Sequence, residues 1–208
     1  MNQDTLFSYK FHLFVALSLV VTVGAAQTNA LRAEAPSVKV GDQWKYETRD
    51  RRTGQKESEA LRTVVSVNAS RIEGTENNGA FVATLDMNVL ETSRYTNTGE
   101  VKYLNFPLEI GKKWSFKYDT ISKMSGGKGE WQLDAEVVAF EKTKVQAGEF
   151  DTYRIEYKGF WNNRSQRTNG RFVITNWYAP SARTTVKSEF DDGYAKSTTE
   201  LVEVQLKP

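Results

Sequence analysis

The sequence contains no cysteine and only one histidine, His12. His12 lies in a segment that we expect to be removed on export, so the mature chain would lack both residue types. Their absence excludes thiol nucleophiles, structural disulfides, histidine-based catalytic triads and most zinc sites. Acidic and basic residues are nearly balanced, 28 Lys and Arg against 26 Asp and Glu, which gives a net charge of +2. Such a weak charge in an exported protein argues against nucleic acid as a partner.

Long apolar runs are also absent, except near the N-terminus. Residues 11–23 are mostly apolar and are followed by the small residues Gly24, Ala25 and Ala26. A transmembrane helix needs roughly 20 apolar residues, so this run is short for a membrane span and has the length of a secretory signal core. The pattern predicts a helical signal peptide at residues 1–26, with an uncleaved N-terminal anchor as the alternative.

The expected cleavage site follows Ala26, with Ala30 as the alternative. Beyond it we expect a linker at 27–37 and one β domain at 38–208. No later segment approaches membrane-spanning length, so the mature protein is expected to have no stable membrane span. The lack of cysteine is unusual for a small secreted eukaryotic protein and fits a bacterial envelope better. We therefore predict a periplasmic or secreted location.

The mature chain alternates apolar and polar residues with a period of about two, which is typical of strands with one face in a core. The alternation is clear at 44–48, 81–89, 131–137 and 153–157. Glycine-containing turn signals separate these stretches, and no convincing helix follows Ala30. The predicted fold is all-β: a single antiparallel, strongly curved sheet of about ten strands that forms a barrel or half-barrel. A β-sandwich is the alternative.

One short pattern occurs twice in the chain. Residues 40–46 and 110–116 both contain an aliphatic residue, a glycine, two polar residues and then a Trp-x-aromatic triplet. Glycine permits a tight turn, and the alternating aromatics then face one side of a strand. The repeat indicates either a duplicated ligand pocket or two strands that enter one core with the same turn chemistry.

Several aromatic and polar side chains are candidates for binding a ligand. Trp161 lies where a strand gives way to a polar loop, and Trp177 lies near the next strand end, at the opposite end of the expected hairpin. Asn176 shares an apolar strand face, where a polar group needs a partner: a ligand in a cavity, or the backbone nearby. The candidate ligand-binding residues are Trp44, Trp114, Trp161, Asn176, Trp177 and Tyr178.

Catalytic signatures are weak. Asp134 and Glu136 lie on one polar strand face and Glu156 on another strand, so a carboxylate pair for glycan hydrolysis is conceivable, but solvated surface charges explain all three. Asp191 and Asp192 are not followed by further acidic ligands at calcium-loop spacing. We expect no catalytic residue, no metal site and no cofactor.

Four phrases together carry a resemblance. They are Val40-Gly41-Asp42-x-Trp44-x-Tyr46, Phe106-Pro107-Leu108-x-x-Gly111-Lys112-x-Trp114, Ala147-Gly148-x-Phe150-x-Thr152-Tyr153, and Trp177-Tyr178-Ala179-Pro180 with Val186-Lys187. Over roughly residues 38–206 the chain resembles uncharacterised exported bacterial proteins rich in β-structure. The resemblance implies a fold and no activity. In architecture the chain is also similar to periplasmic lipoprotein-carrier half-barrels, which hold acyl chains on a concave sheet, although their covering helices are not evident here.

Three functional hypotheses follow. The first is a non-enzymatic bacterial envelope protein that binds a small apolar or amphipathic ligand. The second is an interaction or assembly module for another envelope protein. The third is a carboxylate-dependent enzyme that acts on glycans.

Overall fold

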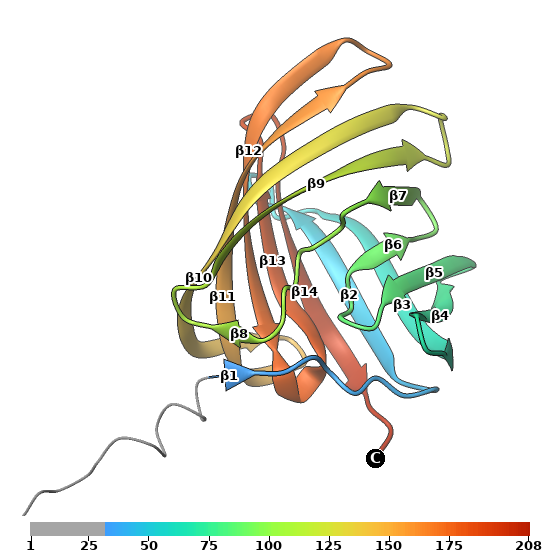
Figure 1. The fold of residues 1–208 in the computed structure, drawn as a ribbon, viewed down its shortest axis with the longest axis vertical. Helices are drawn as coiled ribbons and strands as arrows, with labels where there is room; N and C mark the ends of the chain where they lie inside the picture. Colours follow the sequence, from blue (N-terminus) through green and yellow to red (C-terminus); the bar gives the residue numbers. More distant parts are fainter. Residues whose placement is uncertain (1–31) are drawn as a thin grey trace, which may run out of the picture. The chain divides into compact units, whose positions relative to one another are not determined.

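The computed structural model describes residues 32–208 (Figure 1). The predicted signal peptide and both cleavage sites lie outside the described residues. Twelve antiparallel strands form a closed barrel in the order β10-β11-β12-β13-β14-β2-β3-β4-β5-β6-β7-β9, and β9 pairs with β10 to close it. The barrel strands are β2 (Gln43–Asp50), β3 (Lys56–Val67), β4 (Arg71–Glu76), β5 (Gly79–Thr84), β6 (Val89–Glu91), β7 (Tyr95–Gly99), β9 (Lys113–Ser122), β10 (Lys128–Val145), β11 (Gly148–Asn163), β12 (Thr168–Ala179), β13 (Thr184–Asp191) and β14 (Lys196–Gln205).

Three short elements lie outside the barrel ladder. β1 (Arg32–Ala33) pairs with β8 (Leu108–Glu109), and a 3-10 turn, η2 (Pro180–Ala182), joins β12 to β13. Figure 1 shows β1 and β8 together at one end of the barrel. Ala33 and Val38 are buried, so residues 32–38 contribute side chains to the core.

The all-β prediction is confirmed, and its details need correction. The sheet has twelve strands rather than about ten, and it is a closed barrel, so the half-barrel and the sandwich are both wrong. The stretch 81–89, which alternates like one strand, is two strands, because the chain turns between Thr84 and Asn88. The turn is closed by the hydrogen bond from Met87 N to Thr84 O, and Met87 has a φ of 62°. The neighbouring strand β7 is short and polar and therefore carries no apolar alternation.

The twice-occurring pattern corresponds to two equivalent turns. Gly41 and Gly111 have φ values of 89° and 87°, in the left-handed region that favours glycine. Each glycine N–H donates to a carbonyl of another strand, Gly41 to Val64 and Gly111 to Val137. Each of these two partners in turn donates to the residue after the glycine. The repeat is thus two strands that enter one core with the same turn chemistry.

The segment between β7 and β8, residues 100–107, runs inside the barrel; we call it the crossing segment (Figure 1). Its Tyr103 ring packs edge-on against Phe116, Tyr118 and Tyr157, with centroid distances of 5.2, 6.0 and 5.4 Å. These three residues come from the inner faces of β9 and β11. The crossing segment therefore adds Tyr103 to the aromatic packing of the barrel interior.

Side chains satisfy several backbone groups of the crossing segment, in addition to the hydrogen bond from the Glu100 N–H to the Lys117 carbonyl of β9 at 3.1 Å. Asn88 donates to the Leu104 carbonyl and accepts from the Leu104 N–H, both at 2.8 Å. The Trp114 indole donates to the Lys102 carbonyl at 2.7 Å, and the Tyr157 hydroxyl donates to the Tyr103 carbonyl. Buried backbone groups need such partners, so these contacts hold the segment in place.

Candidate ligand-binding pocket

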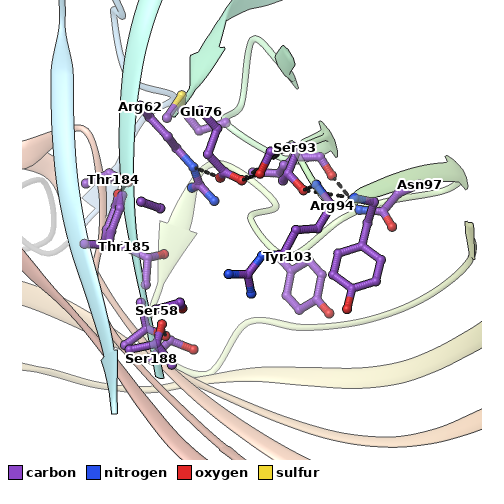
Figure 2. Close-up of a pocket in the computed structure, with 18 of the residues that line it drawn as sticks. Ser58, Arg62, Glu76, Ser93, Arg94, Asn97, Tyr103, Thr184, Thr185 and Ser188 are labelled. Atoms are coloured by element: carbon purple, nitrogen blue, oxygen red, sulfur yellow. Dashed lines mark hydrogen bonds and ion pairs between the residues drawn. The ribbon is translucent and has the colours of Figure 1, made fainter. Parts of the chain in front are cut away.

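The barrel contains an open pocket of about 710 Å³, lined by side chains from most barrel strands and from the crossing segment (Figure 2). Exposed residues of two turns, Asn77 between β4 and β5 and Arg94 between β6 and β7, also line it. The pocket therefore reaches the surface at these turns. Its lining divides into an aromatic side, a hydroxyl side and a pair of arginines.

The aromatic side is formed by Tyr103, Tyr118, Trp131 and Phe190. Tyr118 and Trp131 stack in parallel with ring centroids 6.4 Å apart, because they are directly paired residues on β9 and β10. The two tyrosine hydroxyls share a hydrogen bond of 2.8 Å. These rings offer a large apolar surface that an aliphatic or planar group can cover.

The hydroxyl side comes from inner positions of β2, β3, β13 and β14. The hydroxyl-bearing lining residues are Thr48, Ser58, Thr184, Thr185, Ser188 and Thr199. Three of them have intramolecular partners, since Thr48 bonds to Thr199 at 2.8 Å and Thr184 to Tyr46 at 2.6 Å. The hydroxyls of Ser58, Thr185 and Ser188 have no hydrogen-bond partner among residues 32–208 and face the pocket (Figure 2).

Two arginines line the pocket, and they differ in whether the guanidinium is paired with a carboxylate. Arg62 forms an ion pair with Glu76 at 2.9 Å, and its guanidinium lies 5.2 Å from the ring centres of both Tyr46 and Phe81. Glu76 also accepts hydrogen bonds from the backbone and hydroxyl of Ser93, so both of its carboxylate oxygens have protein partners. Arg94 extends into the pocket (Figure 2) and forms no ion pair within the described part of the chain.

Of the sequence-predicted ligand residues, Asn176 lines the pocket. Its side chain is 8% exposed, and its Oδ1 atom has no hydrogen-bond partner within residues 32–208. The backbone partner that would have satisfied this oxygen is therefore not made. Asn176 is directly paired with Ser188 of β13, which places an unused acceptor beside an unused hydroxyl.

The other five predicted residues do not line the pocket. Trp44 is fully buried and donates to the Ala182 carbonyl at 2.8 Å, and Tyr178 is fully buried against Phe106. The Trp114 indole donates a hydrogen bond to the Lys102 carbonyl of the crossing segment. Trp161 pairs with Gly170 at one end of the β11–β12 hairpin, and Trp177 pairs with Arg154 near the other, so the expectation of opposite ends is confirmed. Trp177 donates to Glu141 and carries the Lys187 ammonium 5.0 Å from its ring.

The three carboxylates considered for glycan hydrolysis lie outside the pocket. Asp134 accepts from the Ser115 hydroxyl at 2.6 Å, Glu136 pairs with Lys113 at 3.3 Å, and Glu156 pairs with Arg154. They are surface charges on β10 and β11, which leaves the glycan hypothesis without a site at these residues. Within residues 32–208 no group of three or more His, Asp or Glu side chains is arranged to hold a metal ion. No helix in the same range is long and apolar enough to cross a membrane.

Burial of the tyrosines sets the response of the pocket to alkaline pH. Removal from water raises the pKa of Tyr103 to about 12 and raises the pKa of Tyr118 and Tyr157 well above the ordinary value. In the unfolded chain these phenols ionise near pH 10. Between that pH and the folded pKa, the unfolded state loses protons that the folded state keeps, so stability falls as pH rises.

We therefore expect a stability plateau below about pH 10 and cooperative unfolding above it. Tyrosinate absorbance and far-ultraviolet circular dichroism, followed together during alkaline titration, measure this. The buried tyrosines should ionise only as the β-sheet signal is lost. Ionisation of all tyrosines near pH 10 with an intact sheet signal would contradict the burial of this cluster.

No protein-family model matches the sequence, and no curated protein is detectably related to it. Solved structures do share its fold. An uncharacterised Bacteroides fragilis protein, described as exported and as having a YmcC-like fold, aligns with a TM-score of 0.60 at 16% identity, over 84% of this chain and 99% of that one. A Parabacteroides distasonis protein described as a lipoprotein aligns with a TM-score of 0.56 at 16% identity, over 83% and 99% of the two chains.

These similarities confirm, at the level of the fold, the resemblance to uncharacterised exported bacterial proteins rich in β-structure. The alignments cover 84% and 83% of this chain, so the fold is shared over nearly all of the described residues. At this identity it carries no information about ligand residues. The pocket has to be interpreted from its own side chains.

Proposed function

We propose that this protein is an exported, non-enzymatic envelope protein that binds a small amphipathic molecule in the barrel pocket. The pocket of about 710 Å³ carries the proposal, because it combines an aromatic side with hydroxyls that have no protein partner. Its volume lies within the roughly 300–1,000 Å³ of typical small-molecule sites. Export is supported by the signal-peptide pattern and by the fold shared with an exported protein and a lipoprotein.

The mixed lining favours an amphipathic ligand over a purely apolar one. A bare hydrocarbon in this space would remove water from Ser58, Ser188 and Asn176 and supply no hydrogen bond in return. Each such loss costs about 1–3 kcal/mol, which would cancel much of the gain from covering the aromatic side. A ligand with both a polar and an apolar part satisfies both sides of the pocket.

Native mass spectrometry of the mature protein from its own cells tests the proposal. We expect an additional mass that is released on denaturation and that identifies the size of the ligand. Ser188→Phe should abolish the additional mass, because it places a phenyl ring inside the pocket at a position with no hydrogen bond to lose. The matched control is Thr198→Phe on the adjacent strand, which pairs with outward-facing Glu189 and should retain the ligand.

A bare mass for the wild-type protein would refute the pocket as a stable binding site. It would favour the interaction module instead. The surface for that alternative is the outer face of β11 and β12, where Phe160 and Val173 are 45% and 46% exposed and lie in a shallow groove. Equal loss of ligand in Ser188→Phe and Thr198→Phe would point to unfolding rather than to a filled pocket, and melting temperatures separate the two.

A further inference from the structure

The charges around the pocket do not cancel. Four charged residues line it: Glu59, Arg62, Glu76 and Arg94. Glu59 pairs with Lys45 at 3.4 Å and with Lys56 at 2.6 Å, and Arg62 pairs with Glu76 at 2.9 Å. Arg94 is left as a positive charge without a carboxylate among the described residues. The field inside the pocket is therefore positive on one side.

The position of Arg94 is fixed by its own turn. The Thr92 hydroxyl accepts hydrogen bonds from the Arg94 and Tyr95 N–H groups, at 3.1 and 3.2 Å. The acidic residue next to this turn, Glu91, forms an ion pair with Lys123 at 2.6 Å. Figure 2 shows the Arg94 side chain extending into the space between Tyr103 and the side of the pocket that carries Thr185 and Ser188. A guanidinium at this position presents five N–H donors and no acceptor.

The groups that face Arg94 are also suited to an anion. The Ser58, Thr185 and Ser188 hydroxyls have no partner within residues 32–208, and a hydroxyl can rotate to donate to an oxyanion. Hydrogen bonds to a charged acceptor are roughly twice as strong as neutral ones.

We propose that the ligand is an amphipathic acid, whose carboxylate or phosphate group is bound between Arg94 and the hydroxyls of Ser58, Thr185 and Ser188. Its apolar body lies against Tyr103, Tyr118 and Trp131 on the aromatic side. This inference rests on the proposed function, because it specifies the chemistry of the same pocket. It adds that the ligand is negatively charged, that Arg94 anchors it, and that its apolar body lies on the aromatic side of the pocket.

Calorimetric titration with four probes of equal chain length tests it, each below its micelle concentration and at one salt concentration. The probes are decanoate, decyl phosphate, 1-decanol and decyltrimethylammonium. We expect at least one anion to bind about tenfold more tightly than decanol, since a charge-assisted contact is at stake, and the cation to bind most weakly. The stronger of the two anions tells whether the natural acid is a carboxylate or a phosphate.

Arg94→Gln should lower the affinity for the preferred anion about tenfold and leave decanol binding unchanged. The control is Arg71→Gln on β4, an exposed arginine that pairs with Glu73 at 3.4 Å and does not line the pocket; it should change neither affinity. Equal binding of anions and decanol, tighter binding of the cation, or an unchanged Arg94→Gln variant would overturn the inference and leave the proposed pocket intact. If no probe binds at millimolar concentration, the inference is wrong, and if the protein also carries no additional mass, the proposed function fails with it.

Discussion

Replacing Trp44 with alanine should lower the free energy of unfolding by about 3–5 kcal/mol, which makes it one of the most damaging single changes in the chain. The side chain is 0% exposed and enters the core directly after the turn at Gly41. Its indole donates to the Ala182 carbonyl at 2.8 Å and so ties β2 to the turn before β13. The alanine variant would leave both a large cavity and a carbonyl without its donor. Urea denaturation measures the loss.

Trp177→Ala provides a matched comparison, because Trp177 has the same side chain on the opposite face of the sheet. Trp177 is partly buried against the core residues, donates a hydrogen bond to Glu141 and carries the Lys187 ammonium over its ring. Its truncation leaves a smaller cavity than that of the fully buried Trp44, so Trp177→Ala should lower the free energy of unfolding by at least about 1 kcal/mol less than Trp44→Ala. Similar losses in both would contradict the assignment of Trp44 to the inside and Trp177 to the outside of the barrel.

Asn88→Ala should lower the free energy of unfolding by about 2–4 kcal/mol and also weaken ligand binding. Asn88 is 4% exposed and satisfies both backbone groups of Leu104, which would otherwise be buried without partners. The crossing segment carries Tyr103 to the aromatic side of the pocket. Loosening this segment therefore affects stability and the binding surface together. Denaturation and titration with the preferred decyl probe measure the two effects.

Two companions sharpen this experiment. Asn88→Asp keeps an acceptor for the Leu104 N–H but removes the donor to its carbonyl, so it should also be destabilised. Asn78→Ala, at an exposed position in the turn between β4 and β5, should change stability by less than about 0.5 kcal/mol. A stable Asn88→Ala variant with normal binding would show that the crossing segment holds its place without this side chain.

Much of the secondary structure could be predicted because strand formation depends on residues close in the chain. Trp131, Leu133 and Ala135 of β10 alternate with polar residues, and all three face the interior of the barrel. The equivalent turns at Gly41 and Gly111 were also visible, since a turn glycine followed by Trp-x-aromatic is a local pattern. The prediction was wrong where local alternation continued through the turn at 84–88 and where short polar strands carried none.

The pocket was much harder to predict, since its residues are far apart in the chain. Asn176 was noticed because a polar side chain on an apolar face needs a partner. Arg94 and Tyr103 were missed, because one lies in a turn and the other in a segment without periodicity. A signal did exist for the hydroxyl side: Thr48, Ser188 and Thr199 take inner positions, whereas Trp44, Val186 and Leu201 are buried apolar residues on the same strands.

The amino-acid pattern alone was enough to establish an all-β chain without thiol or disulfide chemistry, and to predict an export signal that contains the single histidine. These properties depend on composition and on neighbours two residues apart. Barrel closure depends on the pairing of β14 with β2, for example Gln205 with Gln43, which places the two ends of the barrel sequence in register. Only that closure brings Arg94, Tyr103 and Ser188 around one space. The pocket, and with it the proposed ligand, is therefore a property of the folded barrel, because strand register cannot be deduced from local alternation.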